Sequence, residues 1–241
     1  MAYGIKLEVW GELASFNRPE MKVERVSYDV ITPSAARGIL EAIYWKPEMK
    51  WVVDRIHVLR PIRVTHVRRN EISSTIPVTG ATGVRAAMKS ERGALGISVA
   101  EHRQQRAARL LRDVCYGIEA HVEVTAPEQG GDARTSVAKH LEMFKRRARR
   151  GQYFHHPYLG CREFPANFSL VESFADAPDE LAREVDLGLM LHDIEFTEDA
   201  AGTIVESNRG RRLSASPRFF RARMRNGVIE VPPLRAAESS R

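Results

Sequence analysis

A run of alternating residues in the middle of the chain constrains the fold more than any other feature. The apolar members of this run occupy every second position: Val114, Tyr116, Ile118, Ala120, Val122 and Val124. The positions between them hold small, polar or charged residues. A period of two is that of a β-strand with one buried face. The pattern therefore predicts a core strand around which a sheet is built.

The segments before this strand predict further strands. Ile5, Leu7 and Val9 alternate with other residues, which indicates a strand with one buried face. Residues 51–69 are rich in β-branched residues but contain Pro61, which has no backbone N–H to donate to a sheet. We therefore expect either two short strands or one bent strand in this segment.

Two helices are also predicted. Thr32-Pro33-Ser34 combines an N-cap residue with a proline at the first helical position, and Lys46-Pro47 ends the apolar periodicity that follows. The second helix carries apolar residues at spacings of three and four between residues 137 and 148, and Gly151 ends it. Its basic residues fall on the opposite face.

The order of these elements predicts an α+β fold of the ferredoxin-like or RNA-recognition type, in which two helices cover one side of an antiparallel sheet. We expect this domain to span residues 1–171 and to contain a hairpin insertion near residues 72–106. Residues 172–241 show only strand patterns, with Asn226-Gly227 as a tight hairpin turn. They predict a smaller antiparallel β domain.

Positive charge is concentrated on the second helix and the loop that follows it. Between residues 139 and 162, Glu142 is the one acid, against seven bases: Lys139, Lys145, Arg146, Arg147, Arg149, Arg150 and Arg162. The resulting +6 equals the formal net charge of the whole chain. Such a local field attracts a polyanion, and nucleic acid is the leading partner. A solvated helix face is the alternative explanation of a basic run taken alone.

Several classes of protein find no support in the sequence. It contains no G-x-x-x-x-G-K-[ST], H-E-x-x-H or G-x-S-x-G motif and no paired acidic motif with metal spacing, so we expect no ATP, metal or cofactor site. Cys115 and Cys161 form no C-x-x-C motif, which fits a reducing compartment. No run of about 18 apolar residues occurs, so we expect a cytoplasmic protein without a membrane span.

Three residues on the two predicted helices are of the types that cut RNA without a metal ion: Tyr44, Lys139 and His140. A 2′-hydroxyl must lose a proton as it attacks the adjacent phosphate, the phosphorane gains charge, and the 5′-oxygen must be protonated to leave. Histidine, lysine and tyrosine can share these tasks. Spacing alone does not bring the three residues together, and an ordinary core aromatic is the alternative role for Tyr44.

Longer stretches resemble a known family. They are KLEVWGELASFNRPE, YDVITPSAARGILEAIYWKP, LRDVCYGIEAHVEV, AKH and HPYLGCREFPA, and together they run from the N-terminus to about residue 166. These segments resemble CRISPR-associated RAMP proteins of the Cas5 family, in the type I-C (Dvulg) variant. The β-rich remainder fits the smaller C-terminal domain of that family.

The resemblance implies an enzyme that processes precursor CRISPR RNA. Such a metal-independent endoribonuclease cuts within the repeat, at the base of its hairpin, and leaves a 5′-hydroxyl and a 2′,3′-cyclic phosphate. The tyrosine of the family falls on Tyr44, and its adjacent lysine and histidine fall on Lys139 and His140. Many relatives in other type I systems are structural, and a non-catalytic scaffold that binds RNA or duplex DNA is the alternative.

The resemblance also implies partners. The family keeps the 5′ handle of its product and joins the other subunits of the type I-C interference complex. Some members bind duplex DNA, with which a basic surface is compatible. We expect RNA to be held by the basic run Lys145, Arg146, Arg147, Arg149 and Arg150, whose arginines suit a phosphate track.

Two further groups are candidates for RNA binding. His155 and His156 lie beside Tyr153 and Phe154 and are suited to stack on an unpaired base, although a structural role is open for at least one of them. The other group shares one face of a predicted strand: Arg221, Arg223 and Arg225. A solvated hairpin face explains this second group equally well.

Overall fold

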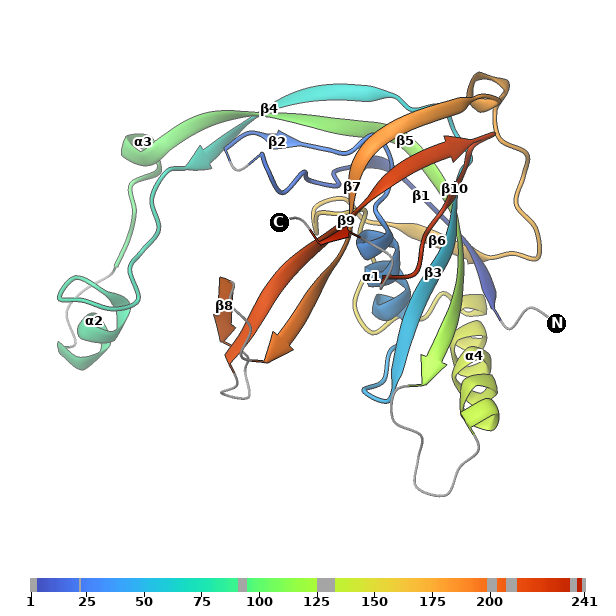
Figure 1. Cartoon of the computed structure of the whole chain (residues 1–241). Helices are drawn as coiled ribbons and strands as arrows, with labels where there is room; N and C mark the ends of the chain where they lie inside the picture. Colours follow the sequence, from blue (N-terminus) through green and yellow to red (C-terminus); the bar gives the residue numbers. More distant parts are fainter. Residues whose placement is uncertain are drawn as a thin grey trace.

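A computed structural model describes residues 4–21, 23–90, 95–124, 133–198, 203–206, 212–234 and 238–239. Its centre is the strand β5 (Arg103–Val124), which pairs antiparallel with β1 (Ile5–Ala14) on one side and β3 (Met49–Val58) on the other (Figure 1). Ile118 faces Leu7 and Ile56 in the two registers, and all three side chains are buried. The predicted core strand is confirmed, and it is longer than its alternating pattern.

The N-terminal half of β5 leaves the core and forms an arm. It pairs antiparallel with β4 (Val64–Ile72) and, over two residues, parallel with β2 (Arg25–Val26). The far end of the arm carries α2 (Val84–Ser90) and α3 (Val99–His102), well away from the rest of the molecule (Figure 1). The break between β3 and β4 includes Pro61, so of the two arrangements expected for this segment, two strands or one bent strand, the structure has two strands.

The C-terminal strands join the same sheet. β10 (Val228–Glu230) pairs with β3 and also with β9 (Arg212–Arg225), which in turn pairs with β7 (Glu184–Glu198). β8 (Thr203–Glu206) and β11 (Glu238–Ser239) also pair with β9, and β6 (Asn167–Leu170) pairs with the free side of β1. All these strands belong to one hydrogen-bonded sheet. The expected division into two domains at residue 171 stays a prediction.

The turn between β9 and β10 is the one that its sequence predicts. Asn226 and Gly227 have φ angles of 50° and 75°, and Val228 pairs with Arg225 directly across the turn. A two-residue hairpin with positive φ at both positions matches the twist of its strands, and Asn-Gly is the sequence that this turn favours. A Cβ on Gly227 would lie 2.5 Å from the Cβ of Ala177, so the packing here also requires glycine.

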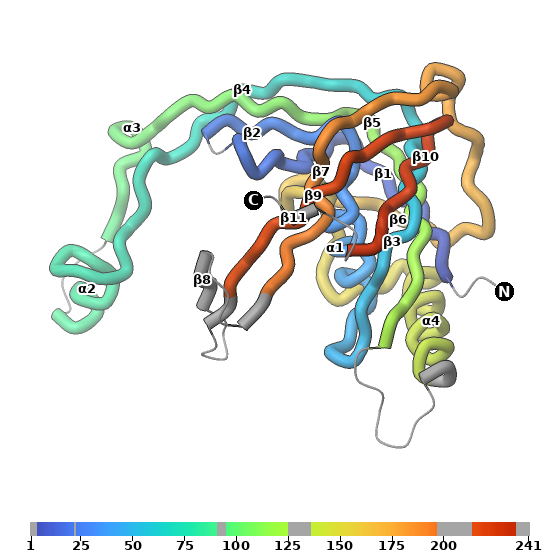
Figure 2. Tube along the Cα trace, in the orientation of Figure 1, coloured from blue at the N-terminus to red at the C-terminus, as the bar shows by residue number. Residues whose placement is uncertain are grey.

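Both predicted helices are present. α1 (Pro33–Ile43) begins after Thr32, whose side-chain oxygen accepts a hydrogen bond from the Ala35 backbone N–H at 3.3 Å. α4 (Ala133–Arg149) buries Leu141, Phe144 and Ala148. α1 lies between β3 and β7 (Figure 2), and a short 3-10 helix (Asp179–Leu181) precedes β7.

The α+β class with a large antiparallel sheet is confirmed. The sequence predicts two helices, whereas the described part of the chain contains four, because α2 and α3 are short and bury no side chain that would create a periodic pattern. The detailed ferredoxin-like arrangement stays a prediction. Within the described residues, no helix is both long enough and apolar enough to cross a membrane.

Cys115 makes the stability of this sheet depend on pH. Its side chain is buried, and burial, together with the nearby Glu8 carboxylate, raises its pKa from 9.0 to about 11. Between these values the unfolded chain releases the thiol proton while the folded chain keeps it. The stabilisation is therefore complete below about pH 9 and is lost as the pH rises through about 11.

We expect the free energy of unfolding of the wild-type chain to fall by about 1–2 kcal/mol more between about pH 8.5 and about pH 10.5 than that of Cys115→Ala. Urea unfolding of both proteins at the two pH values measures this difference. Other groups that titrate in this range are common to the two proteins, so they cancel. Equal losses in the two proteins would contradict the assignment.

Candidate functional site

The end of α1 and the middle of α4 bring two of the three predicted catalytic residues together. Tyr44 is the C-cap of α1, and its Oη lies 3.0 Å from Nδ1 of His140 on α4. The two residues are 96 positions apart in the chain. Tyr44 is 2% exposed and His140 is 1% exposed. The hydrogen bond therefore lies in the interior, where it is shielded from water.

Glu48, in the turn after α1, faces the other side of the imidazole. Its Oε1 lies 3.9 Å from Nε2 of His140. A carboxylate at this position favours a proton on Nε2, which leaves the Nδ1 lone pair to accept a hydrogen bond from the Tyr44 hydroxyl. Burial and the Glu48 charge raise the pKa of Tyr44, against the opposing effect of Arg147 and Lys139. Tyr44 is therefore a neutral hydrogen-bond donor near pH 7.

Arg147 fixes this arrangement from two turns further along α4 than His140. Its guanidinium donates a hydrogen bond to the backbone oxygen of Ile43 at 3.1 Å and lies 5.2 Å from the centre of the Tyr44 ring. The side chain thus binds the last carbonyl group of α1, where a cation is favourable. Arg147 is directed at Tyr44, unlike the other arginines of the basic run. Its predicted contact with RNA stays a prediction.

The remaining predicted phosphate-binding arginines lie on the exposed face of α4. A shallow hollow of about 520 Å³ on this face is lined by Lys139, Glu142, Met143, Arg146, Arg149 and Arg150. Lys139 is exposed and immediately precedes the buried His140, so the third catalytic candidate reaches solvent where the other two do not. The hollow carries four bases and one acid, which suits a chain of phosphates.

Lys145 differs from its basic neighbours. Its ammonium lies 3.3 Å from the Glu142 carboxylate, and with Arg149 it lines a second cavity of about 460 Å³. Asp54 and His121 line the other side of that cavity. Lys145 therefore lies at the border between the basic hollow and a mixed-charge surface.

The loop after α4 returns to the end of α1. The backbone N–H of Phe154 donates to the Ala42 oxygen at 2.8 Å, which anchors the two predicted histidines nearby. The His155 ring stacks at 6.3 Å on Tyr158, and His156 Nδ1 lies 2.8 Å from the Pro157 oxygen. His156 thus has a local structural partner, and RNA binding by either histidine stays a prediction.

The second predicted arginine group is paired with acids. Arg221 lies 2.6 Å from Asp186, and both Arg223 and Arg225 lie within 3.9 Å of Glu184. These acids belong to β7, the neighbouring strand, so the sequence of β9 alone could not show them. The arginine side chains remain at least 54% exposed. The acids offset part of their charge, and their contact with RNA stays a prediction.

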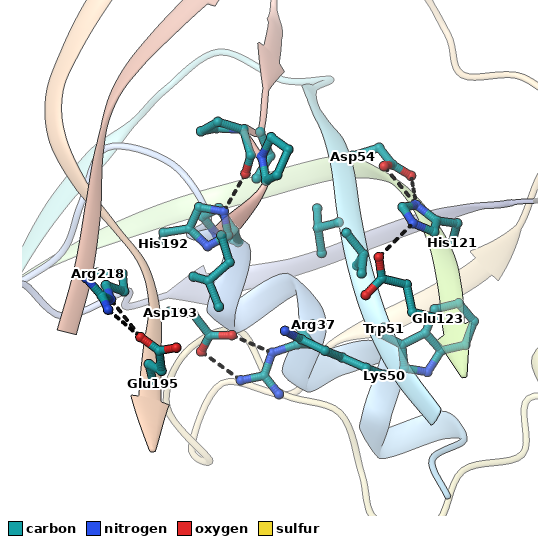
Figure 3. Close-up of a pocket in the computed structure, with 17 residues that line it drawn as sticks. Arg37, Lys50, Trp51, Asp54, His121, Glu123, His192, Asp193, Glu195 and Arg218 are labelled. Atoms are coloured by element: carbon teal, nitrogen blue, oxygen red, sulfur yellow. Dashed lines mark hydrogen bonds and ion pairs between the residues drawn. The ribbon is translucent and has the colours of Figure 1, made fainter. Parts of the chain in front are cut away.

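A cavity of about 820 Å³ between α1, β3, β7 and β9 has a different character (Figure 3). Arg37 forms two hydrogen bonds to Asp193, and Arg218 forms two to Glu195. On the opposite wall Asp54 lies 2.9 Å from His121. Because its arginines are already neutralised by carboxylates, the cavity is poorly suited to a polyanion. None of the three catalytic candidates lines it.

Sequence reasoning missed two positions in this region, Trp45 and Glu48. Both follow Tyr44 in the segment YWKPE, where proline ends the helix and leaves the next residues in an irregular turn. Their closeness to Tyr44 in the sequence was the one signal that could have pointed to them, since their side chains belong to no periodic pattern. Among the described residues, no group of three or more histidine, cysteine, aspartate or glutamate side chains is arranged to hold a metal ion.

Similarity to known proteins agrees with this fold. Two solved structures have the same fold. One is a functionally uncharacterized protein from Streptococcus mutans, with a TM-score of 0.62 and 20% identity over 98% of this chain and 95% of that chain. The other is a CRISPR-associated protein, with a TM-score of 0.59 and 22% identity over 98% of this chain and 94% of that chain. A family model described as CRISPR-associated protein (Cas_Cas5) matches residues 4–232.

Two curated relatives are more similar in sequence. Both are named CRISPR pre-crRNA endoribonuclease Cas5d. The protein from Mannheimia succiniciproducens is 50% identical over the full length of both chains. The protein from Thermus thermophilus is 45% identical and covers 95% of this chain and 91% of its own. The chain belongs to the Cas5d family of CRISPR-associated proteins.

Arg146 and Arg147 are neighbours in sequence with different surroundings, so they form a matched pair for testing the site. We expect Arg146→Ala to weaken RNA binding and to lower the slope of log affinity against log salt by roughly 0.7–0.9. Arg147→Ala should instead destabilise the fold by about 1–2 kcal/mol, because it leaves the Ile43 oxygen without its partner.

Salt titrations of RNA affinity and urea unfolding of both variants measure these effects. If the two variants changed the salt slope and the stability by the same amounts, the distinction drawn between the two arginines would be wrong.

Proposed function

We propose that this chain is an endoribonuclease that cuts precursor CRISPR RNA within the repeat hairpin without a metal ion. The contact between Tyr44 and His140, beside an exposed Lys139, carries the proposal. These are the residue types that 2′-hydroxyl attack requires. Two relatives that match nearly the whole chain at 50% and 45% identity and are named as pre-crRNA endoribonucleases support it.

The geometry favours a proton relay in which Tyr44 is the group nearest the substrate. The 2′-hydroxyl passes its proton to Tyr44 Oη while the tyrosine proton moves to Nδ1 of His140. The new bond joins the 2′-oxygen to phosphorus, and the bond from phosphorus to the 5′-oxygen breaks. Lys139 stabilises the phosphorane and protonates the leaving oxygen. The products are a 2′,3′-cyclic phosphate and a 5′-hydroxyl.

Glu48 contributes to this step by stabilising the imidazolium that forms. Its carboxylate lies 3.9 Å from Nε2, the nitrogen that already carries a proton before the relay begins. An opposite charge at this distance favours the protonated ring. Glu48 thus orients His140 before the reaction and offsets its charge during it.

Access to the pair requires the long side chain of Arg147 to move. Arg147 lies over the Tyr44 ring, and Glu48 faces His140. An RNA phosphate would attract the arginine, so substrate binding itself favours the displacement of Arg147 from the ring, while Glu48 stays beside the imidazole. Only a change of side-chain rotamers is required, because the backbone of α1 and α4 already holds the catalytic groups.

The product would stay bound. We place the 5′ handle of the guide along the basic hollow of α4, where four bases face solvent. In this state the chain acts as a subunit of the type I-C interference complex. Duplex DNA is a second ligand that the same charged surface can hold.

The alternative function is that of a non-catalytic scaffold that binds RNA or duplex DNA in the same kind of complex. The burial of Tyr44 and His140, at 2% and 1% exposure, favours it. The scaffold would use every basic residue named above and would shift RNA without shortening it.

Cleavage of the chain's own repeat RNA in EDTA tests the proposed function. We expect the purified protein to cut this RNA and to leave intact a copy with a 2′-deoxy sugar at the mapped cut, because the nucleophile is then missing. Binding without cleavage of either RNA would establish the scaffold.

The catalytic assignment is tested by single substitutions. We expect His140→Ala or Lys139→Ala to lower the single-turnover cleavage rate at least 100-fold while RNA affinity changes by less than about threefold for His140→Ala. Met88→Ala on α2, far from the site, serves as the control. Full cleavage by the His140 variant would refute the relay.

A further inference from the structure

Two large aromatic side chains are exposed near the end of α1, one in the residue after Tyr44 and the other in the loop after α4. Trp45 is 49% exposed and Phe154 is 84% exposed. Exposed aromatic side chains of this size gather at sites that bind other molecules, since each removes a large apolar area from water when it is covered. We call Trp45 and Phe154 together the aromatic rim.

The backbone holds the aromatic rim in place. Trp45 follows directly on Tyr44, whose backbone oxygen accepts a hydrogen bond from the buried Trp51 at 2.8 Å. The Phe154 N–H donates to the oxygen of Ala42 at 2.8 Å. The backbone of both members of the rim therefore lies within one helical turn of Tyr44 at the end of α1. Tyr153 differs, because its ring contacts His156 and Phe168.

The charged surroundings indicate what covers the aromatic rim. The loop that carries Phe154 begins at the basic C-terminal end of α4, where Gln152 N–H donates to the Arg147 oxygen. Arg149 and Arg150, at the same end, are exposed and line the basic hollow. A ligand that lies on the rim and continues along α4 must combine flat aromatic groups with negative charge. Single-stranded RNA has this combination.

We propose that Trp45 stacks on the unpaired base next to the bond that is cut, with Phe154 as an adjoining stacking surface. Attack by a 2′-hydroxyl requires the nucleophile, the phosphorus and the leaving oxygen to lie in line. The A-form stack holds them out of line, so one flanking base must leave the stack. The exposed indole of Trp45, one residue after Tyr44, stabilises that displaced base. Trp45 is thus a positioning residue.

This inference rests on the proposed function for its role in cleavage, but the stacking itself can be measured without cleavage. The repeat RNA with a 2′-deoxy sugar at the mapped cut cannot react. In that RNA, 2-aminopurine is placed in turn on each side of the cut. We expect its fluorescence to be quenched at one position by wild-type protein and by Trp45→Phe, and to be restored with Trp45→Ala at saturating protein.

The effect on cleavage is measured with the natural RNA under single-turnover conditions. We expect Trp45→Ala to slow cleavage about 10- to 100-fold while the dissociation constant rises less than about fivefold, and Trp45→Phe to recover most of the rate. Met88→Ala, which removes an even more exposed apolar side chain from α2, should change neither value. Thermal unfolding confirms that the Trp45 variants are folded.

The partner base is identified by an RNA that lacks it. An abasic nucleotide at the quenched position should slow wild-type cleavage as much as Trp45→Ala does. The two changes together should be no worse than either alone, because both remove the same contact. Independent, multiplying effects would overturn the proposal.

The remaining outcomes separate this inference from the proposed function. Quenching that depends on Trp45 without any cleavage by the wild-type protein would support the stacking site and leave the chain a scaffold. Cleavage that is unaffected by Trp45→Ala, with quenching also unchanged, would overturn the aromatic rim and leave the nuclease in place.

Discussion

The contacts of one buried tryptophan connect the elements that form the site. Trp51 on β3 packs at 4.7 Å against the Phe144 ring of α4, and its Nε1 donates to the Tyr44 oxygen at the end of α1. The side chain is fully buried, so both interactions are made away from water. One residue of the sheet thereby fixes the separation between α1 and α4. The short distance between Tyr44 and His140 follows from this packing.

Helix α4 has buried residues on one face and exposed basic residues on the other. Positions 140, 144 and 147 of α4 point at α1 and the sheet, whereas positions 139, 146 and 149 point at solvent. The helical period of 3.6 residues explains why adjacent residues such as Lys139 and His140 have opposite exposures. The charges proposed to bind substrate and the buried groups proposed to transfer protons can therefore occupy one short segment without the charges being desolvated.

The sequence predicts the framework well because its elements have strong local signals. The alternation around Ile118, the Thr32 cap and the Asn226-Gly227 turn each depend on nearby residues, and each is present in the structure. The pairing of Tyr44 with His140 could be anticipated from family resemblance, but spacing across 96 residues cannot supply a distance.

Other features could not be read from the chain because they depend on partners distant in sequence. In the sequence, Arg147 cannot be distinguished from its basic neighbours, but in the structure it binds the Ile43 oxygen. Arg221 likewise has no acid next to it in the sequence, but Asp186 pairs with it from the neighbouring strand. Glu48 and Trp45 lie in a turn, where no periodicity distinguishes a functional side chain from a solvated one. Local sequence patterns predict where helices and strands lie. The partners of a charged side chain depend on which distant segments pack against it, and a local pattern does not contain that information.

The position of β10 has a consequence for synthesis of the protein. β3 is complete once residue 58 has been made, and β5 covers one of its edges by residue 124, but the strand on its other edge spans residues 228–230. For the intervening hundred residues of translation, the backbone of β3 presents an unpaired edge that can capture other strands. During this part of translation the exposed edge of β3 makes the chain prone to aggregation, and a chaperone that covers the edge would prevent it.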